Sequence, residues 1–272
     1  MTNILKNRLK QGKKTIGCFL QTLSPVAAEI ISQSGLDWLI VDLEHAPGDF
    51  ANLQAQLQAM NGSGVVPFAR APWNDAVAIK RILDTGVMGV LVPYVNTREE
   101  AEAAVAACKY PPQGVRGVAG SPRAAGYTRN AKSYLGSANA DTIVMIAVET
   151  TEAIENLDAI LAVKDLDGIF IGPMDLATSM GYLGDPSQPE VQKAIAGVEK
   201  KVFASGKFLG TVGTTWEAAS ACFRKGYQWM ILMQDGAALR KAADDASSKF
   251  RNEYGDQSLP ADNMFRGTVP CD

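Results

Sequence analysis

Short apolar segments recur along the whole chain, and amphipathic segments separate them. Each apolar segment is nearly continuous, as expected for parallel strands that are buried on both faces. The pattern predicts eight strands, at residues 15–20, 38–43, 65–70, 89–94, 142–149, 168–172, 208–212 and 229–233. It predicts helices at residues 25–35, 74–86, 97–109, 150–162, 189–206, 215–226 and 236–250.

Capping residues mark the ends of several predicted helices. Asn74 stands where a helix that ends before Gly86 would begin, and Thr97 lies three residues before Glu100, as in a capping box. Strands and helices alternate with a period of about 30 residues, which is typical of repeated βα units. The sequence therefore predicts an α/β protein with a single (β/α)8 TIM barrel over residues 1–250, followed by a polar tail over residues 251–272.

A doubly wound open sheet is the alternative architecture. Sheets of that kind that bind dinucleotides carry a G-x-G-x-x-G turn after an early strand, and this chain has none. Gly114, Gly117 and Gly120 have a different spacing, and no helix opens after them. They belong to segment 110–141, which is longer than the other connections and which we interpret as an excursion toward the active site or another subunit.

Charge and cysteine content exclude several classes of protein. Lys and Arg number 26 against 29 Asp and Glu, so nucleic acid is not an expected partner. No apolar run is long enough to span a membrane, and the polar N-terminus does not resemble a secretory signal. The four cysteines form no CxxC pair, so we expect a reduced, cytoplasmic protein; they are Cys18, Cys108, Cys222 and Cys271.

The chain contains one histidine, His45. A zinc site with two or three histidines cannot be built from one subunit. None of the eight predicted strands contains a lysine, so a Schiff base on a strand lysine is not expected either.

Polar side chains gather where the predicted strands end, which is the catalytic face of a TIM barrel. Glu149 and Asp175 follow successive strands, and two adjacent carboxylates repel each other unless a cation lies between them. Oxygen ligands favour Mg²⁺ or Mn²⁺, whereas ion pairs with arginines at the rim are the alternative. The polar residues at the strand ends are Gln21, Asp42, Glu44, His45, Arg70, Glu149, Asp175 and Gln234.

Arg70 and His45 are the candidates for substrate binding and proton transfer. A guanidinium at a strand end can bind a carboxylate or an enolate oxygen, and its alternative role is an ion pair with Asp42 or Asp84. An imidazole beside carboxylates can move protons near neutral pH, although a lone histidine can equally be a surface or packing residue. Backbone N–H groups after the Gly172-Pro173 turn can bind an anion, unless Asp175 merely caps that turn.

Six segments of the chain resemble the metal-dependent pyruvate aldolases of the 4-hydroxy-2-oxoheptanedioate aldolase and 2-dehydro-3-deoxyglucarate aldolase family. The resemblance extends from about residue 5 to about residue 250, and it rests on DWLIVDLEHAP, VPFARAPWND, LVPYVNTREEAEAAV, YPPQGVRGV, VETTEAIENLDAI and DGIFIGPMDLATSMGYLGDPSQPEV. It implies the barrel of the phosphoenolpyruvate/pyruvate superfamily. It also implies a homohexamer in which the last helix packs on a neighbouring barrel.

The resemblance implies roles for individual residues, motif by motif. Glu149 of VET and Asp175 of GPMDL would bind the divalent metal, Mg²⁺ or Mn²⁺ with Co²⁺ as a third candidate. Arg70 of PFARAPWN would contact the keto oxygen of pyruvate and stabilise the enolate. His45 of DLEH would shuttle the proton, with support from Asp42 and from Asp84. Asp84 ends a predicted helix, so it is expected near the opposite face or in another subunit's site.

Substrate binding is assigned to turns on the same face. The backbone of Gly172, Pro173, Met174 and Asp175 would hold the pyruvate carboxylate. The chain departs from the family at Ala147, where a glutamine is usual. Unusual turns after the last two strands predict that Val212, Thr214 and Gln234 shape the side that binds the aldehyde.

The predicted function is a metal-dependent carbon–carbon lyase that cleaves a 4-hydroxy-2-oxo acid into pyruvate and an aldehyde, and that also catalyses the reverse addition. Two alternatives remain open. One is a lyase of the same superfamily that acts on a coenzyme A thioester. The other is a barrel that binds oxo acids without catalysis.

Overall fold

The computed structural model describes residues 3–213 and 215–255. The described residues do not include Thr214 or residues 256–272 of the predicted tail, which contain Cys271. The chain consists of two compact units, Met1–Asp235 and Gly236–Asp272. The described part of the second unit is the rest of a helix that extends to Tyr254, four residues beyond the predicted helix end. A domain boundary at residue 250 stays a prediction.

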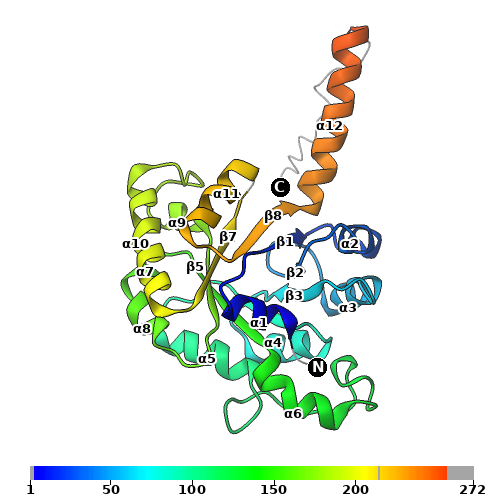
Figure 1. Cartoon of the computed structure of the whole chain (residues 1–272), viewed down its shortest axis with the longest axis vertical. Helices are drawn as coiled ribbons and strands as arrows, with labels where there is room; N and C mark the ends of the chain where they lie inside the picture. Colours follow the sequence, from blue (N-terminus) through cyan, green and yellow to red (C-terminus); the bar gives the residue numbers. More distant parts are fainter. Residues whose placement is uncertain (1–2, 214, 256–272) are drawn as a thin grey trace, which may run out of the picture. The chain divides into compact units, whose positions relative to one another are not determined.

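Eight parallel strands close into a barrel in the first unit, in the order of the sequence (Figure 1). β1 pairs with β2 on one side and with β8 on the other, which completes the ring. The predicted (β/α)8 barrel is confirmed, and the open sheet is excluded. The strands lie within two residues of their predicted bounds: β1 (Thr15–Leu20), β2 (Trp38–Asp42), β3 (Val66–Arg70), β4 (Gly89–Val92), β5 (Ile143–Val148), β6 (Gly168–Ile171), β7 (Phe208–Val212) and β8 (Trp229–Gln234).

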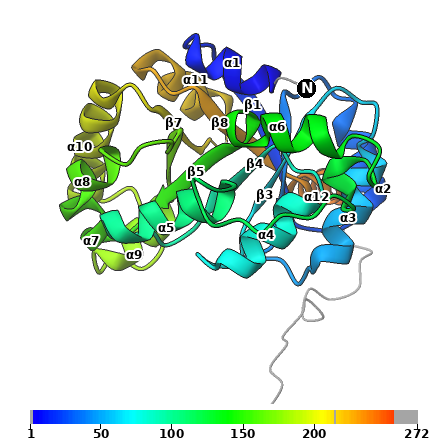
Figure 2. The same cartoon turned by 90° about the horizontal axis from the view of Figure 1, so that it is seen from below.

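Apart from the last helix, which belongs almost entirely to the second unit, the helices surround the strands of this unit (Figures 1 and 2). Their bounds are α1 (Ile4–Lys10), α2 (Pro25–Ser32), α3 (Phe50–Ala59), α4 (Ala76–Asp84), α5 (Arg98–Cys108), the 3₁₀ turn η1 (Arg123–Ala125), α6 (Ala131–Asp141), α7 (Thr151–Glu155), α8 (Leu157–Leu161), α9 (Pro173–Ser179), α10 (Pro189–Ser205), α11 (Trp216–Lys225) and α12 (Asp235–Tyr254), which continues into the second unit. No helix in the described part of the chain is both long and apolar enough for a membrane span.

Local chemistry explains where the helices begin. The capping box of Thr97 and Glu100 is present as predicted. The cap of α4 is Asp75 rather than Asn74, because the Asp75 side chain accepts the N–H of Ala78 at 2.7 Å. Asn74 instead donates to the backbone carbonyl of Glu100. The predicted helix 150–162 is divided into α7 and α8.

Bulky aromatic side chains fill the half of the barrel that lies toward the N-terminal ends of the strands. Trp38 and Trp229 stack with ring centroids 3.5 Å apart, and Phe68 packs against both. Gly17 leaves the space that Trp38 occupies, since a Cβ at position 17 would lie 2.2 Å from Trp38 Cε3. The barrel interior is therefore a packed core rather than a channel.

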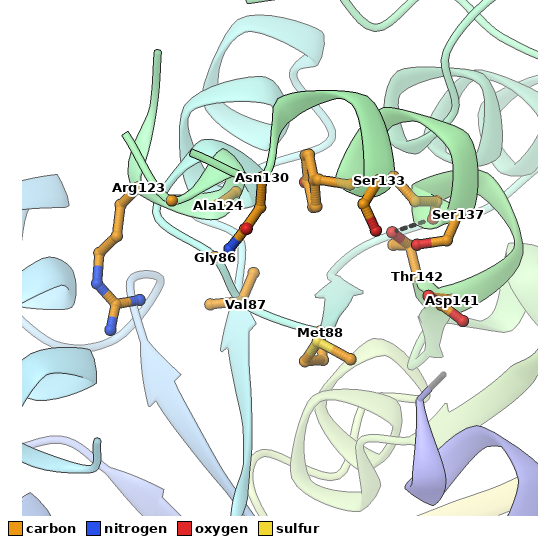
Figure 3. A pocket seen from close by; sticks show the side chains of 13 residues that line it. Gly86, Val87, Met88, Arg123, Ala124, Asn130, Ser133, Ser137, Asp141 and Thr142 are labelled. Atoms are coloured by element: carbon orange, nitrogen blue, oxygen red, sulfur yellow. Dashed lines mark hydrogen bonds between the residues drawn. The ribbon is translucent and has the colours of Figure 1, made fainter. Parts of the chain in front are cut away.

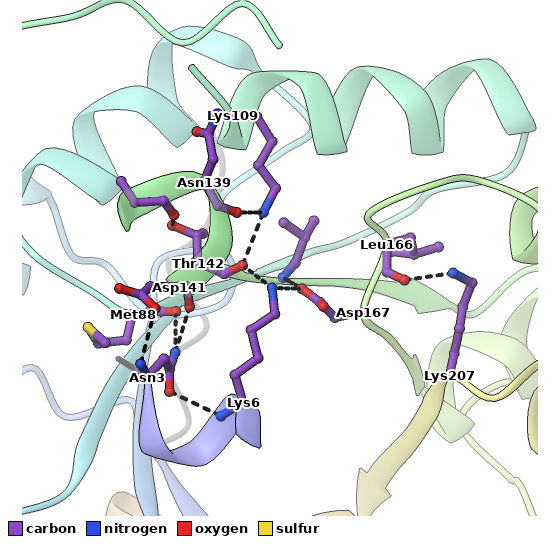
Figure 4. Close-up of polar contacts among 12 residues, drawn as sticks. Asn3, Lys6, Met88, Lys109, Asn139, Asp141, Thr142, Leu166, Asp167 and Lys207 are labelled. Carbon is purple, nitrogen blue, oxygen red and sulfur yellow. Dashed lines mark hydrogen bonds and ion pairs between the residues drawn. The ribbon is translucent and has the colours of Figure 1, made fainter. Parts of the chain in front are cut away.

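α1 closes the N-terminal end of the barrel. Its Leu5 and Leu9 belong to the apolar cluster inside the barrel. Lys6 donates from Nζ to the carbonyl of Thr142 at 2.8 Å and to Asp167 Oδ2 at 2.9 Å (Figure 4). Asn3 binds the carbonyls of Met88 and Asp141 nearby. Because α1 covers the N-terminal end of the barrel, the face at the C-terminal ends of the strands is the accessible one.

Segment 110–141 folds against this closed end and forms η1 and α6. Its Arg116 side chain is fully buried and pairs with Asp84. A cavity of about 480 Å³ lies between α6 and the residues that lead into β4 (Figure 3). The cavity is lined by Gly86, Val87, Met88, Arg123, Ala124, Gly126, Asn130, Ser133, Tyr134, Ser137, Ala138, Asp141 and Thr142.

Candidate active site

The ends of β2 and β3 bring Asp42 and Arg70 together, because the two residues are directly opposite in the strand register. Arg70 donates from Nε to Asp42 Oδ1 at 2.9 Å and from Nη2 to Oδ2 at 2.7 Å. The Asp42 side chain is fully buried. The ion pair that the sequence allowed as an alternative role for Arg70 is thus present, and its partner is Asp42 rather than Asp84.

Asp42 is the centre of a wider hydrogen-bond network. Gln21 donates from Nε2 to Oδ2 at 2.8 Å, and the backbone N–H groups of Glu44 and His45 donate to Oδ1. Burial by itself raises the pKa of Asp42, but the hydrogen bonds and the charge of Arg70 outweigh burial and bring this pKa below its ordinary value. An ionised Asp42 therefore fixes the guanidinium at the barrel mouth.

Glu44 lies in the bend after β2, two residues beyond Asp42. Its Oε2 atom lies 3.0 Å from Arg70 Nη1 and 3.7 Å from His45 Nε2. Burial raises the pKa of Glu44, the charges of Arg70 and His45 lower it, and those of Asp42 and Asp175 raise it. Glu44 was predicted at the rim without a role, and its position two residues after Asp42 was the only signal in the sequence.

His45 lies in the loop after β2, and its side chain is 58% exposed. Glu44 is the carboxylate that its imidazole approaches, whereas Asp42 reaches its backbone N–H. The predicted support of the imidazole by Asp42 is therefore not a side-chain contact in this structure.

Glu149 follows β5 and is 3% exposed. The backbone N–H of Tyr94 donates to its Oε1 atom at 2.8 Å, from a residue with the positive φ of 54°. Burial, together with the negative charges of Glu44 and Asp175, raises the pKa of Glu149 to about 7, although the Tyr94 hydrogen bond and Arg70 lower it. Sequence reasoning missed Tyr94, because its contribution is a backbone group that no residue type signals.

Asp175 stands in the first turn of α9, just after the Gly172-Pro173 turn. Its charge raises the pKa of both Glu44 and Glu149, so these carboxylates share one region of the mouth. We call the residues of this region the rim cluster: Asp42, Glu44, His45, Arg70, Glu149 and Asp175.

The carboxylates of the rim cluster fit a divalent metal ion. Glu149 is a buried carboxylate whose pKa is raised by its surroundings, and a cation between Glu149 and Asp175 would relieve the repulsion. No group of three or more metal-binding side chains exists in residues 3–213 and 215–255. Two oxygen-donating side chains suit Mg²⁺ or Mn²⁺, which keep positions for water and substrate.

The predicted substrate-binding residues lie at the same end of the barrel. Val212 ends β7 and packs partly against the apolar cluster inside the barrel, while Gln234 ends β8 opposite Phe19. Gly172 caps α9, Pro173 is its first residue, and the Met174 side chain is exposed. Ala147 is buried in the inner cluster beside Phe170. The roles of these residues stay predictions, and Thr214 lies outside the described residues.

Among the predicted site residues that the structure describes, Asp84 is separated from the rim cluster by the fold. It ends α4, which runs back toward the N-terminal ends of the strands, and it accepts a hydrogen bond from Arg116 Nη2 at 2.7 Å. The expectation that Asp84 lies near the opposite face agrees with this position. Its catalytic role stays a prediction.

Comparison with known proteins places this geometry in context. The family described as HpcH/HpaI aldolase/citrate lyase matches residues 15–242. The chain is 37% identical over 249 residues to 5-keto-4-deoxy-D-glucarate aldolase of Escherichia coli O139:H28 (strain E24377A / ETEC), an alignment that covers 92% of this chain and 97% of the relative.

Solved structures show the same similarity. A HpcH/HpaI aldolase/citrate lyase family protein from Burkholderia cenocepacia J2315 superposes with a TM-score of 0.88 at 34% identity, over 92% of this chain and 100% of the other. A HpcH/HpaI aldolase from Desulfitobacterium hafniense DCB-2 gives a TM-score of 0.84 at 28% identity, over 96% and 99% of the two chains. The citrate synthase SbnG gives 0.81 at 27% identity, over 92% and 98%.

Proposed function

The chain belongs to the HpcH/HpaI aldolase/citrate lyase family, and we propose that within this family it is a divalent-metal-dependent aldolase that cleaves a 4-hydroxy-2-oxo acid into pyruvate and an aldehyde. The observation that carries the proposal is the rim cluster, in which a fixed arginine, a histidine and two candidate metal ligands meet at the open end of the barrel. The first candidate substrate is 5-keto-4-deoxy-D-glucarate, after the name of the relative.

Glu149 and Asp175 would hold the ion, Mg²⁺ or Mn²⁺ with Co²⁺ as a third candidate. When bound, it supplies Lewis-acid polarisation of the 2-oxo group. Burial, with the charges of Glu44 and Asp175, raises the pKa of Glu149, and a divalent ion bound there would favour the ionised carboxylate.

Arg70 and His45 would act on the substrate directly. His45 takes the proton of the 4-hydroxyl group, the C3–C4 bond breaks, and its electron pair becomes the enolate of pyruvate while the aldehyde leaves. Arg70, held by Asp42, donates hydrogen bonds to the developing enolate oxygen, and no reorganisation is required because the guanidinium is already fixed. A proton delivered to C3 then completes pyruvate.

The two ends of the substrate would meet different parts of the rim. The turn of Gly172, Pro173 and Met174 is assigned to the carboxylate of the pyruvate portion. Val212 and Gln234 are assigned to the aldehyde portion. In the reverse direction the same groups would accept pyruvate and an aldehyde as partners.

Pyruvate release tests the proposal. The purified enzyme should release pyruvate from 5-keto-4-deoxy-D-glucarate, lose this activity in EDTA and regain it with Mg²⁺ or Mn²⁺. Glu149→Ala should remain inactive at any metal concentration that restores the native chain. Undiminished activity in EDTA, together with full activity of Glu149→Ala, would exclude the proposed metal site.

Two further assays separate the alternatives. Condensation of acetyl-CoA with oxaloacetate to a citryl thioester of coenzyme A, without pyruvate release from oxo acids, would favour the thioester lyase. Binding of oxalate with no turnover of any oxo acid would favour a non-catalytic barrel. Light scattering of the native protein tests the expected homohexamer, and cell fractionation tests the expected cytoplasmic location.

A further inference from the structure

Tyr94 contacts the candidate metal ligand Glu149 through its backbone. Its N–H donates to Glu149 Oε1 at 2.8 Å, and its φ of 54° lies in the left-handed region. Residues with bulky side chains rarely adopt this conformation, which is disfavoured by about five- to thirty-fold relative to right-handed backbone. Such a conformation persists only where surrounding contacts offset its cost, so the neighbours of Tyr94 matter to Glu149.

The conformation of Tyr94 decides where its N–H points, because the segment that follows Tyr94 is anchored. The N–H of Asn96 donates to Glu100 Oε2 at 2.6 Å, and Asn156 Nδ2 donates to the Asn96 carbonyl at 2.9 Å. The peptide group that carries the Tyr94 N–H is planar and turns as a unit. With the following segment held, a negative φ at Tyr94 would turn this peptide group away from Glu149.

The Tyr94 ring stacks on Trp73, which comes from the loop after β3. The ring centroids are 5.7 Å apart, and the angle between the ring planes is 28°. Both rings lie at the surface, with Trp73 56% exposed and Tyr94 40% exposed, and a cavity of about 330 Å³ borders them. The stack is therefore a main restraint on the Tyr94 side chain. Aromatic pairs of this kind change an equilibrium by about two- to ten-fold, which is the same order as the backbone cost.

Trp73 is itself held by the loop that carries it. Its carbonyl accepts the N–H of Asp75 at 2.9 Å, and the next residue, Asn74, donates from Nδ2 to the carbonyl of Glu100 at 3.0 Å. Glu100 also holds the segment after Tyr94 through its carboxylate. The loops after β3 and β4 are thus tied to the same first turn of α5, which keeps the two rings within stacking distance.

We propose that Trp73 is a positioning residue for the metal site, because its stack on Tyr94 stabilises the left-handed backbone that directs the Tyr94 N–H to Glu149. The inference rests on the proposed function, in which Glu149 binds the divalent ion. Trp73 touches neither the ion nor the substrate. It acts on the population of one backbone conformation, and through that conformation on the carboxylate.

Hydrogen exchange of the Tyr94 amide tests the inference without metal or turnover. In the full-length, metal-free protein, Trp73→Ala should accelerate this exchange by about two- to ten-fold, because the open conformation becomes more populated. Trp73→Phe keeps a ring at this position and should retain most of the protection. Glu149→Ala, which removes the acceptor, should exchange at least as fast as Trp73→Ala. Mass spectrometry with fragmentation to single residues measures the rates.

Mn²⁺ affinity reports the consequence at the metal site. Trp73→Ala should weaken Mn²⁺ binding by about two- to ten-fold, measured from the electron paramagnetic resonance signal of the free ion. Tyr94→Gly provides the decisive background, because glycine adopts the left-handed conformation without steric cost. In that background Trp73→Ala should cause no further loss of affinity, since neither a ring to stack on nor a strained backbone remains.

Phe203→Ala is the matched control. It breaks another aromatic pair, formed with Tyr227 at a centroid distance of 5.9 Å, near the end of α10. Both the exchange of the Tyr94 amide and the Mn²⁺ affinity should keep their native values in this variant.

Two results would overturn the proposal. One is native exchange of the Tyr94 amide in Trp73→Ala. The other is the same loss of Mn²⁺ affinity from Trp73→Ala with and without Tyr94→Gly, which would show that Trp73 does not act through the Tyr94 backbone. A native chain that binds no Mn²⁺ would refute the proposed function instead, and the exchange rates would still decide whether Trp73 holds the Tyr94 N–H on Glu149.

Discussion

Gly172 approaches Glu149 so closely that a Cβ atom at position 172 would lie 2.4 Å from the Oε2 atom of Glu149. No real Cβ contact is that short, so the absence of a side chain at Gly172 gives the carboxylate its position. The turn after β6 therefore leaves room for the Glu149 carboxylate at the end of β5. The Tyr94 N–H donates a hydrogen bond to the other carboxylate oxygen, Oε1. The geometry of the candidate metal ligand thus depends on two backbone features.

Gly172→Ala tests this dependence. The added methyl group should displace the Glu149 carboxylate and weaken Mn²⁺ binding by about 10- to 100-fold, the range seen when groups that orient metal ligands are lost. Binding can be followed by the electron paramagnetic resonance signal of free Mn²⁺. Gly197→Ala in α10 is the matched control, since no atom lies within 4 Å of its added Cβ. Equal Mn²⁺ affinity in the two variants would contradict the argument.

Asp42 should make the stability of the protein depend on pH in the acid range. Its folded-state pKa is lower than its unfolded value near 3.8, so its contribution is complete above that value and is lost as the pH falls through the folded pKa. Asp42→Asn should lower the free energy of unfolding by about 3 kcal/mol at pH 7, because it leaves the buried Arg70 without its charged partner.

Urea denaturation at a series of pH values measures this effect. The stability difference between the native chain and Asp42→Asn should stay constant from neutral pH to about pH 5 and shrink below about pH 4. Asp49→Asn, at an exposed helix cap, serves as the control. A difference that does not change with pH would show that Asp42 does not ionise with the lowered pKa.

The barrel could be predicted from the sequence because parallel strands that are buried on both faces have nearly continuous apolar sequences, and eight such segments alternate with helices. α1, α3 and α6 were not predicted, because α1 has only 7 residues and because α3 and α6 carry a weak apolar pattern. α6 in particular contains two serines and a glycine within AKSYLGSANAD. Its helical form depends on packing against the closed end of the barrel rather than on its own composition.

The site could be predicted only to the level of residue identity. Arg70 was expected to pair with Asp42 or Asp84, and the choice depends on the register that sets Asp42 opposite Arg70. The register of β2 against β3 is set when the strands pair in the closed barrel, so no local sequence pattern reveals it. The approach of Glu44 to His45 depends on the conformation of the bend after β2, which the residue types alone do not report.

Asp235 holds the loop after β1 and, through it, the network around Arg70. Its carboxylate accepts the N–H groups of Gln21 and Thr22 and the hydroxyl of Thr22. Gln21 in turn donates to Asp42. Asp235→Ala should reduce the free energy of unfolding by about 2 kcal/mol, since hydrogen bonds to a buried charged group contribute about 1.5 to 3 kcal/mol.

The same variant should also weaken the binding of oxalate, an analogue of the pyruvate enolate, by a few-fold, because Gln21 loses its anchor. Isothermal titration calorimetry in the presence of Mg²⁺ measures this. Thr22→Val removes the hydroxyl alone and should have a smaller effect on both quantities. If Asp235→Ala lowers stability but leaves oxalate affinity intact, the network does not reach Arg70.

Gly17 leaves the space that the Trp38 ring needs inside the barrel, near the N-terminal ends of the strands. Trp38 lies over it, and Trp229 and Phe68 enclose the other sides of the Trp38 ring, so the indole has no room to withdraw from a methyl group. Gly17→Ala should therefore cost about 3 kcal/mol or more, at the upper end of overpacking substitutions. Gly136→Ala in α6 is the control, with no atom within 4 Å, and should be neutral or stabilising by up to about 1 kcal/mol.

The double variant Gly17→Ala with Trp38→Phe keeps this prediction testable if the single variant does not fold. A phenyl ring is smaller than an indole, so it leaves space for the added methyl group, and the second substitution should recover part of the lost stability. Urea denaturation followed by near-UV circular dichroism compares the native chain, the two single variants Gly17→Ala and Trp38→Phe, and the double variant. Additive effects of the two substitutions would mean that Gly17 does not act through Trp38, because residues in steric conflict must couple.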